Sequence, residues 1–396
     1  DPVLPNILGG DLLVDYTLGA PDTVAPAITF RSPAPDATDV PTNGFLLVVF
    51  NEPMLPTTIN SASVTLTGES SGVVEAGLSY DFQGHFLSLR PAALLNLGER
   101  YTVSLTGLTD PAGNALPDTQ WSFTVGQTSD LVPPTVSAVS PAADATGVLA
   151  TSSVTLVFSE VVDPTSLQGL EVRDPAGTRL AGRLVYSPAS ATVVFTPAQL
   201  LGSSLRYRVH VDGVRDLVGN AMAQPFDSGF TTRRILFFDD FEQDTAKWAL
   251  PQPTGNGPRW GLETRAYRSA FHSLTDSVRG KYASQSDTAA TLAQPIDLVD
   301  PDSSTLAPFP EVLVQFWLRA RLERANDFAY LEYSLDGGQS WVEGGRYGRQ
   351  NAGTLHEVAI SNPAGATGLL LRVRLSSDSR RNFDGIFVDD VLVQGP

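Results

Sequence analysis

The sequence predicts an all-β protein made of three β-sandwich domains in tandem. Three observations predict this fold class: a repeat of about 100 residues, apolar residues that alternate with period two, and turn residues that separate these runs at intervals of roughly 8–12 residues. The length of 396 residues allows two to four domains of roughly 100–200 residues each. With 42% hydrophobic and 17% charged residues, each domain can bury a core.

The first half of the chain contains two copies of one domain. Residues 33–38 recur as residues 141–146, and Phe50 recurs as Phe158, in both cases 108 positions later. Further landmarks follow in the same order: Leu89–Pro91 with Phe195–Pro197, Tyr101–Val103 with Tyr207–Val209, Asp110–Ala115 with Asp216–Ala221, and Trp121–Thr124 with Gly229–Thr231. A constant order of landmarks indicates a duplicated domain.

The residues within each copy are typical of strands and turns. Val154, Leu156 and Phe158 alternate with less apolar neighbours, as expected of a strand with one buried face. Each copy has a Gly-Asn pair before its last strand, and these residues tolerate the positive φ of a tight turn. Residues 132–134 (Val-Pro-Pro) are stiff and predict an interdomain linker.

These motifs together resemble the bacterial Ig-like domain first seen in surface-layer proteins. The resemblance covers about 27–126 and 134–232, and we assign the two domains to 27–128 and 129–233. It implies a spacer or stalk of a surface or secreted protein. Glu52 and Glu160 follow the same strand in the two copies, and Asp110 and Asp216 open the Gly-Asn turns. We interpret these four acids as structural residues that cap loops; metal binding is the alternative.

The third domain is assigned to residues 234–396, where the repeat ends and aromatic residues and arginine become more frequent. Its order of motifs resembles the jelly-roll module of secreted bacterial immune-inhibitor-A-type metallopeptidases and, more distantly, MAM domains. The sequence departs from that pattern at Asp384–Val388 and in the Pro/Ser-rich stretch 301–310. The resemblance implies a non-catalytic β-sandwich with a calcium site.

A cluster of acidic residues is expected where the two ends of the third domain meet. Acids stand at the start of its first strand and near the end of its last, with one further acid in a turn, and Ca²⁺ prefers six to eight hard oxygen ligands. The candidate ligands are Asp239, Asp240, Glu242, Asp276, Asp389 and Asp390. The alternative is a set of exposed loop acids, and the sequence does not decide which member of each Asp pair points inward.

No catalytic site is predicted. Residues 68–72 fit G-x-S-x-G, but the stretch lies in a polar hairpin and lacks the following helix that a nucleophile elbow needs. Residues 334–341 resemble an Asp-box hairpin, in which Asp336 caps a Gly-rich turn and Trp341 packs beneath it. The four histidines are scattered without an H-E-x-x-H motif. Arg372 and Arg374 are expected to face solvent.

Charge and composition exclude several kinds of partner and site. The net charge of −17 disfavours nucleic acid and anionic membranes as partners, and no run approaches the roughly 20 apolar residues of a membrane span. Cysteine is absent, which excludes disulfides and thiolate metal sites. The start at Asp1 is compatible with removal of a signal peptide, although a trimmed chain would start in the same way.

Three functions therefore compete. The preferred one is a secreted or cell-surface structural protein whose partner is itself or other surface proteins. The second is an adhesin or a module that binds glycans or proteins. The third is an accessory region of a larger secreted hydrolase, which a coding sequence beyond Pro396 would favour.

Residues 1–26 form an N-terminal extension with an apolar stretch at 7–18. Val14, Tyr16 and Leu18 alternate as in a strand, and prolines flank the stretch. Such a segment must be covered: within the chain, by a sheet edge of its own first repeat or along the linker, or by a neighbouring molecule in head-to-tail assembly. Both alternatives stay open at this point.

Overall fold

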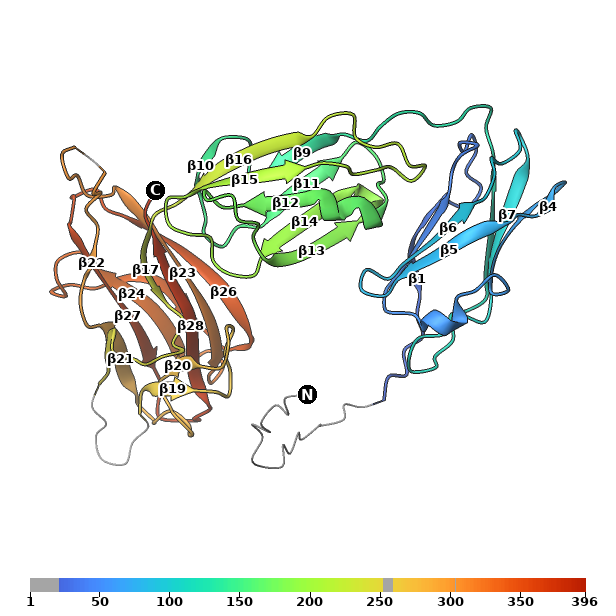
Figure 1. Cartoon of the computed structure of the whole chain (residues 1–396). Helices are drawn as coiled ribbons and strands as arrows, with labels where there is room; N and C mark the ends of the chain where they lie inside the picture. Colours follow the sequence, from blue (N-terminus) through green and yellow to red (C-terminus); the bar gives the residue numbers. More distant parts are fainter. Residues whose placement is uncertain (1–20, 252–258, 303) are drawn as a thin grey trace, which may run out of the picture.

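The computed structural model describes residues 21–251, 259–302 and 304–396, and it consists of three β-sandwiches in series (Figure 1). The predicted all-β class with tandem sandwiches is confirmed. The predicted strand 14–18 lies outside the described residues. In the described part, no helix is long and apolar enough to cross a membrane.

The first repeat packs two four-stranded sheets face to face. One has the order β1-β2-β6-β5 and the other β4-β3-β7-β8. Alternate residues of both sheets face the core, where Tyr101 and Phe123 stack with ring centroids 5.9 Å apart. The strands are β1 (Ile28–Ser32), β2 (Leu46–Phe50), β3 (Val64–Gly68), β4 (Gly72–Val73), β5 (Ala76–Asp81), β6 (Phe86–Pro91), β7 (Arg100–Leu105) and β8 (Thr119–Thr124), with the 3-10 turn η1 (Pro56–Thr58).

The second repeat has the same plan, as the sequence repeat predicts. Its sheets have the orders β13-β14-β11-β9 and β10-β16-β15-β12, with β10 parallel to β16. Tyr207 and Phe230 repeat the aromatic stack at 5.7 Å. The elements are β9 (Val136–Ser140), β10 (Ala145–Val148), β11 (Val154–Phe158), η2 (Pro164–Gly169), β12 (Leu170–Arg173), β13 (Gly182–Ser187), η3 (Pro188–Ser190), β14 (Thr192–Pro197), β15 (Arg206–Val211) and β16 (Phe226–Thr232).

The third domain is a larger sandwich with one extensive core. Its first sheet has the order β19-β20-β28-β23-β26 with β17 paired to β28, and its second has the order β18-β21-β27-β24-β25 with β22 paired to β27. The strands are β17 (Ile235–Asp239), β18 (Trp248–Ala249), β19 (Gly261–Glu263), β20 (Ser273–Thr275), β21 (Asp287–Leu292), β22 (Ile296–Asp297), β23 (Glu311–Arg321), β24 (Phe328–Ser334), β25 (Val342–Tyr347), β26 (Gln350–Ser361), β27 (Gly368–Ser376) and β28 (Gly385–Gln394).

The two repeats are joined by side-chain contacts as well as by the predicted linker. Asn43 of the first repeat donates to the carbonyl of Asp130 and accepts from its N–H, both at 2.9 Å. Phe86 also packs on the core of the second repeat, with its ring 6.2 Å from that of Tyr186. The linker backbone is thus held against the first repeat, and an aromatic contact crosses the junction.

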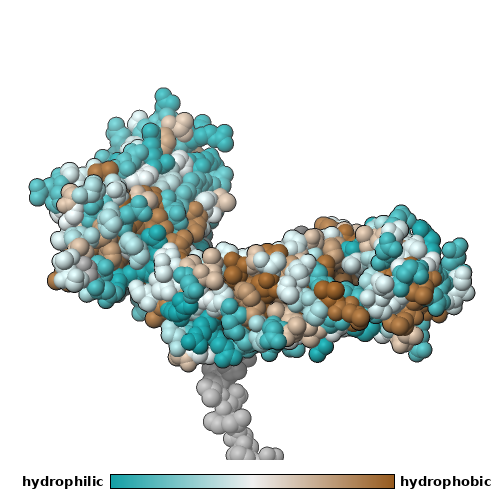
Figure 2. Space-filling view, turned by 90° about the horizontal axis from the view of Figure 1, so that it is seen from above, coloured by the Kyte–Doolittle hydropathy of each residue, from teal (hydrophilic) through white to brown (hydrophobic). Residues whose placement is uncertain are grey.

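The second repeat and the third domain share a buried polar junction. Gln394 at the end of β28 is fully buried. Its Oε1 accepts from the N–H of Ala150 at 2.8 Å, and its Nε2 donates to Gln315 Oε1 at 3.1 Å. Thr151 of the second repeat donates to the same Gln315 oxygen at 3.2 Å. Figure 2 shows the two repeats as one elongated body with the third domain at its end.

Candidate functional site

Five of the six predicted acids have hydrogen-bond or ion-pair partners outside their own turn, and Asp276 lies apart from the others. Asp239 is buried at the end of β17. Its Oδ2 accepts from the indole N–H of Trp248 at 2.8 Å, and its Oδ1 lies 3.2 Å from the ammonium of Lys247. This carboxylate therefore ties the first strand of the domain to β18.

Asp389 and Asp390 both bind the loop that contains Arg268 and Ser269. Asp389 Oδ2 accepts from the backbone N–H groups of Arg268 and Ser269 at 2.7 and 3.1 Å, and Asp390 Oδ2 binds the Arg268 guanidinium at 2.9 Å. Strand alternation would send neighbouring side chains to opposite faces. Here the register of β28 shifts and Asp390 has a φ of 48°, so a bulge breaks the alternation.

Glu242 binds the other end of this loop. Its Oε1 accepts from the N–H groups of Phe271 and His272 at 3.0 and 2.8 Å. Burial raises the pKa of Glu242, but these hydrogen bonds outweigh burial and hold it below its ordinary value. Asp276 lies elsewhere: it is buried, and its Oδ1 accepts from the N–H of Ile386 at 2.7 Å.

In Asp276 and Asp389, the two most buried of the six acids, burial outweighs the hydrogen bonds to the carboxylate. It raises the pKa of Asp276 to about 7 and that of Asp389 to about 7, because a charge in a water-poor site is disfavoured. The backbone N–H groups that face each carboxylate oppose this shift only in part.

The loop held by these acids, residues 266–272, exposes two aromatic rings. Tyr267 is 42% exposed and Phe271 66% exposed, and their ring centroids lie 6.4 Å apart. Between them, Ala270 has a φ of 40°, a strained backbone conformation for a residue other than glycine. The sequence did not single out this loop, because nothing in 266–272 reveals that distant acids bind its backbone.

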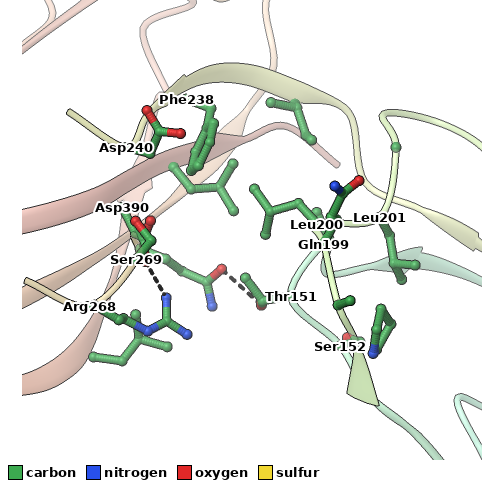
Figure 3. A pocket seen from close by; sticks show the side chains of 18 of the residues that line it. Thr151, Ser152, Gln199, Leu200, Leu201, Phe238, Asp240, Arg268, Ser269 and Asp390 are labelled. Carbon is green, nitrogen blue, oxygen red and sulfur yellow. Dashed lines mark hydrogen bonds and ion pairs between the residues drawn. The ribbon is translucent and has the colours of Figure 1, made fainter. Parts of the chain in front are cut away.

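Asp240 lines a cleft between the second repeat and the third domain (Figure 3). The cleft has a volume of about 760 Å³. Its other walls include Gln199 and Leu200 from the second repeat and Phe238 and Ser269 from the third domain. Among the described residues, the Asp240 carboxylate bonds only the N–H of Glu242 in its own turn, at 3.3 Å, so its charge is largely available to the cleft.

Three other acidic groups have ligand atoms close enough to share one cation. Within the described ranges, carboxylate oxygens lie within 4.8 Å of one another in the sets Asp22, Glu52, Asp110; Asp130, Glu160, Asp216; and Glu323, Asp327, Asp378. None of the six acids predicted as ligands belongs to these sets. Exposed acidic groups are common without an ion, so proximity alone does not make a site.

The first two sets occupy equivalent positions in the two repeats. We call them the repeat triads. In each, the buried Asp of the Gly-Asn turn (Asp110 or Asp216) binds the following Asn, whose side chain donates to the carbonyl of the linker Asp (Asp22 or Asp130) at 3.3 and 3.2 Å. The repeated motifs pointed to the Glu and the turn Asp, but not to the linker Asp. The spacing of 108 positions between Asp22 and Asp130, the same as between Glu52 and Glu160, could have revealed it.

The carboxylates of the second triad repel one another, and this repulsion affects Glu160. Burial, with Asp130 and Asp216 as negative neighbours, raises the pKa of Glu160 to about 7. Uptake of a proton or a nearby cation would relieve this repulsion.

The two motifs that imitate catalytic or recognition sites are structural hairpins. Residues 68–72 link β3 and β4, and the N–H groups of Ser70 and Ser71 bind Glu99 Oε1 at 2.7 and 2.6 Å. In the other hairpin Asp336 accepts from Ser334 Oγ and from the N–H of Ser340, as the predicted turn cap requires.

Arg372 and Arg374 lie on the outward face of β27, as expected, but they are only partly exposed to solvent. Their side chains are 24% and 21% exposed, and both bind the buried carboxylate of Glu332. Arg372 stacks over Trp341 and Arg374 over Tyr330, with guanidinium carbons 4.2 and 4.1 Å from the ring centroids. Period two predicts the face of the sheet but not the partners on the neighbouring strand.

Comparison with known families decides the identity of the repeats. The profile of the bacterial Ig-like domain matches residues 22–125 and 130–232, more than half of the chain. The chain belongs to the bacterial Ig-like domain family. The matches begin at the linker acids Asp22 and Asp130, so residues 22–26, which we placed in the N-terminal extension, match together with the first repeat.

A curated relative is an S-layer protein of Geobacillus stearothermophilus, which is 31% identical over 133 residues. The match covers 31% of this chain and 11% of the relative. The chain therefore spans about a tenth of the length of that protein.

Solved structures that match parts of this chain include carbohydrate-binding and adhesin domains. The CBM22-1 xylan-binding domain from Paenibacillus barcinonensis is 14% identical with a TM-score of 0.28, covering 41% of this chain and 95% of that domain. The K1 cleaved adhesin domain of Lys-gingipain from Porphyromonas gingivalis is 12% identical with a TM-score of 0.31, covering 40% and 98%. The N-terminal part of the S-layer protein SbsC is 14% identical with a TM-score of 0.22, covering 52% and 44%. The comparisons give no support to the expected MAM-like or immune-inhibitor-A-type resemblance of the third domain.

Proposed function

We propose that this protein is an extracellular cell-surface spacer in which two Ig-like repeats hold the third domain in a fixed orientation. The family of the repeats and the similarity to an S-layer protein fit a surface protein. The proposal adds that the repeats act as one rigid arm. Its physical basis is the set of polar contacts at both junctions, because flexible linkers with few crossing contacts leave domains free to reorient.

The observation that carries the proposal is the buried Gln394. A side chain amide enclosed between two domains must keep its hydrogen bonds, since a buried polar group without a partner is costly. Its bond to Ala150 exists only while the domains are docked. The linker is also short, because β16 ends at Thr232 and β17 begins at Ile235.

Labelling of intact cells tests the surface assignment. Antibodies against the first repeat and against the third domain should both bind intact producing cells. Signal that appears only after the cells are broken would contradict a surface location.

Calcium is part of the proposal as a stabilising ion. Carboxylate oxygens are the ligands that Ca²⁺ prefers, and both the predicted acids of the third domain and the repeat triads offer them. Calcium at about 100 times its dissociation constant would stabilise the folded state by roughly 2.7 kcal/mol. Thermal melting with calcium or with chelator measures this, and an unchanged melting temperature would contradict it.

Two variants identify the acids that bind calcium. Asp390→Asn should abolish the calcium shift if the predicted acids of the third domain bind the ion. Asp130→Asn should abolish it if the second repeat triad does. Asp118→Asn, in neither set, serves as the control.

Self-assembly through the N-terminal segment also belongs to the proposal. Residues 1–20 are apolar enough to need a partner surface, and strand addition to a neighbouring molecule would join subunits head to tail. Deletion of residues 1–20 should reduce the assembly size in analytical ultracentrifugation. An unchanged size with a destabilised first repeat would place the strand on its own domain instead.

A further inference from the structure

We propose that the 266–272 loop and the cleft beside it form a binding site for a neutral saccharide. The inference rests on the proposed function in one respect, because a spacer would present its third domain for contact. It also gives a physical role to acids that the sequence analysis assigned to calcium.

The loop is preorganised. Asp389 fixes the N–H groups of Arg268 and Ser269, and Glu242 fixes those of Phe271 and His272. Four of its seven backbone N–H groups are thus held by carboxylates from distant segments. A loop that is ordered before binding loses little conformational entropy when a ligand arrives.

The loop has an exposed aromatic surface, which is the kind of surface that sugar rings contact. Tyr267 and Phe271 lie side by side and exposed, although a large apolar ring normally gains by burial. The strained Ala270 between them gives the loop a shape that is costly to maintain, and such strain is concentrated at functional sites. Fixed, exposed aromatic rings are rigid contact surfaces for a ligand.

The adjacent cleft supplies polar groups that converge on apolar walls. Asp240, the Arg268–Asp390 ion pair and Gln199 offer acceptors and donors, while Phe238 and Leu200 are apolar (Figure 3). The hydroxyl of Ser269, which lines the cleft, is buried and has no hydrogen-bond partner. A buried hydroxyl without a partner is unusual, and a ligand that exchanges hydrogen bonds would satisfy it.

The charges of the cleft select the chemical class. Asp240 and Asp390 face it together with one arginine, in a chain of net charge −17, so an anionic ligand is repelled. A saccharide presents hydroxyl groups to carboxylates and C–H faces to aromatic rings, which this arrangement fits. The volume of about 760 Å³ lies in the range of small-molecule sites, roughly 300–1,000 Å³.

Isothermal titration of the full chain with neutral hexasaccharides of the cello, xylo, manno, galacto and chito series tests the proposal. The variants are Phe271→Ala, Tyr267→Ala and Asp240→Asn. Phe82→Ala is the matched control, because Phe82 is 48% exposed on the first repeat, far from the loop in the sequence. Melting curves should be nearly unchanged in Phe271→Ala and Tyr267→Ala, since these rings are exposed.

At least one saccharide should bind, and each of the three variants should lose about tenfold or more in affinity, as residues central to a binding site do. Phe82→Ala should bind like the unmodified chain. Absence of binding across the series, or binding that Phe271→Ala and Asp240→Asn leave unchanged, would overturn the proposal. Capture of a protein ligand through Phe271 without saccharide binding would also overturn it. None of these outcomes bears on the rigid-arm proposal, which depends on the domain arrangement.

Discussion

Replacing Gln394 by alanine should loosen the third domain from the second repeat. The change removes the acceptor for the Ala150 N–H and the donor to Gln315. A buried donor left without a partner costs about 1–3 kcal/mol. Because undocking would let water satisfy the Ala150 N–H, this cost falls on the docked state alone.

The expected change in the docking equilibrium follows from that free energy. With about 1.4 kcal/mol for each factor of ten, a loss of about 1–3 kcal/mol corresponds to roughly 5- to 150-fold. A docked state that dominates in the native chain would then coexist with an undocked one. The change should leave the cores of both domains intact, since Gln394 lies at their junction.

Distance measurements between two spin labels detect this directly. The chain has no cysteine, so labels can be placed at the exposed positions Ser190 and Ala364 through Ser190→Cys and Ala364→Cys. The native background should give one narrow distance distribution, and Gln394→Ala a second, broader population. Gln339→Ala, at an exposed position of the same domain, should change nothing. An unchanged narrow distribution in Gln394→Ala would refute the role given to this junction.

Three further predictions concern single acids. Asp216→Ala should lower the free energy of unfolding of the second repeat by about 1–3 kcal/mol in urea titrations, because the N–H groups of the 216–220 turn and the Asn220 side chain lose their acceptor; an effect below measurement error would count against it. Hydrogen bonds from Ser71, Asn96 and Ser70 outweigh burial and lower the pKa of Glu99 to about 2, from an ordinary value of 4.5. The stabilisation from Glu99 is therefore complete above about pH 4.5 and is lost as the pH falls toward 2, and Glu99→Gln should flatten the acid melting profile of the first repeat in that window. Glu332→Gln should destabilise the third domain by about 1–3 kcal/mol, since Arg372 and Arg374 keep their charges in half-buried positions, and a melting temperature equal to that of the unmodified chain would contradict the assigned ion pairs.

The duplicated fold could be predicted because its signal is local and occurs twice. Period-two runs such as 154–158 and the Gly-Asn turns indicate strands and turns, and the same order of landmarks in both copies supports them. The positive φ of Gly113 and Gly219, 92° and 104°, is the conformation that these turns require.

The partners of the acids could not be predicted, because they depend on contacts between distant segments. Charge clustering indicated that Asp389 and Glu242 needed positive partners, and it suggested an ion. The structure shows that backbone N–H groups of the 266–272 loop bind these carboxylates, which charge clustering alone does not indicate. The bulge at Asp390 is equally hidden, since nothing in the residues Val388–Val391 announces an interruption of strand alternation.

Small-angle X-ray scattering of the full chain in solution tests the rigid-arm proposal most directly. In the described residues, the second repeat lies between the first repeat and the third domain and contacts both. A single arrangement of the three domains should reproduce the scattering curve and the maximum dimension of the particle. No averaging over domain orientations should be needed. A curve that only an ensemble of orientations can fit would contradict the proposal that the repeats hold the third domain in place.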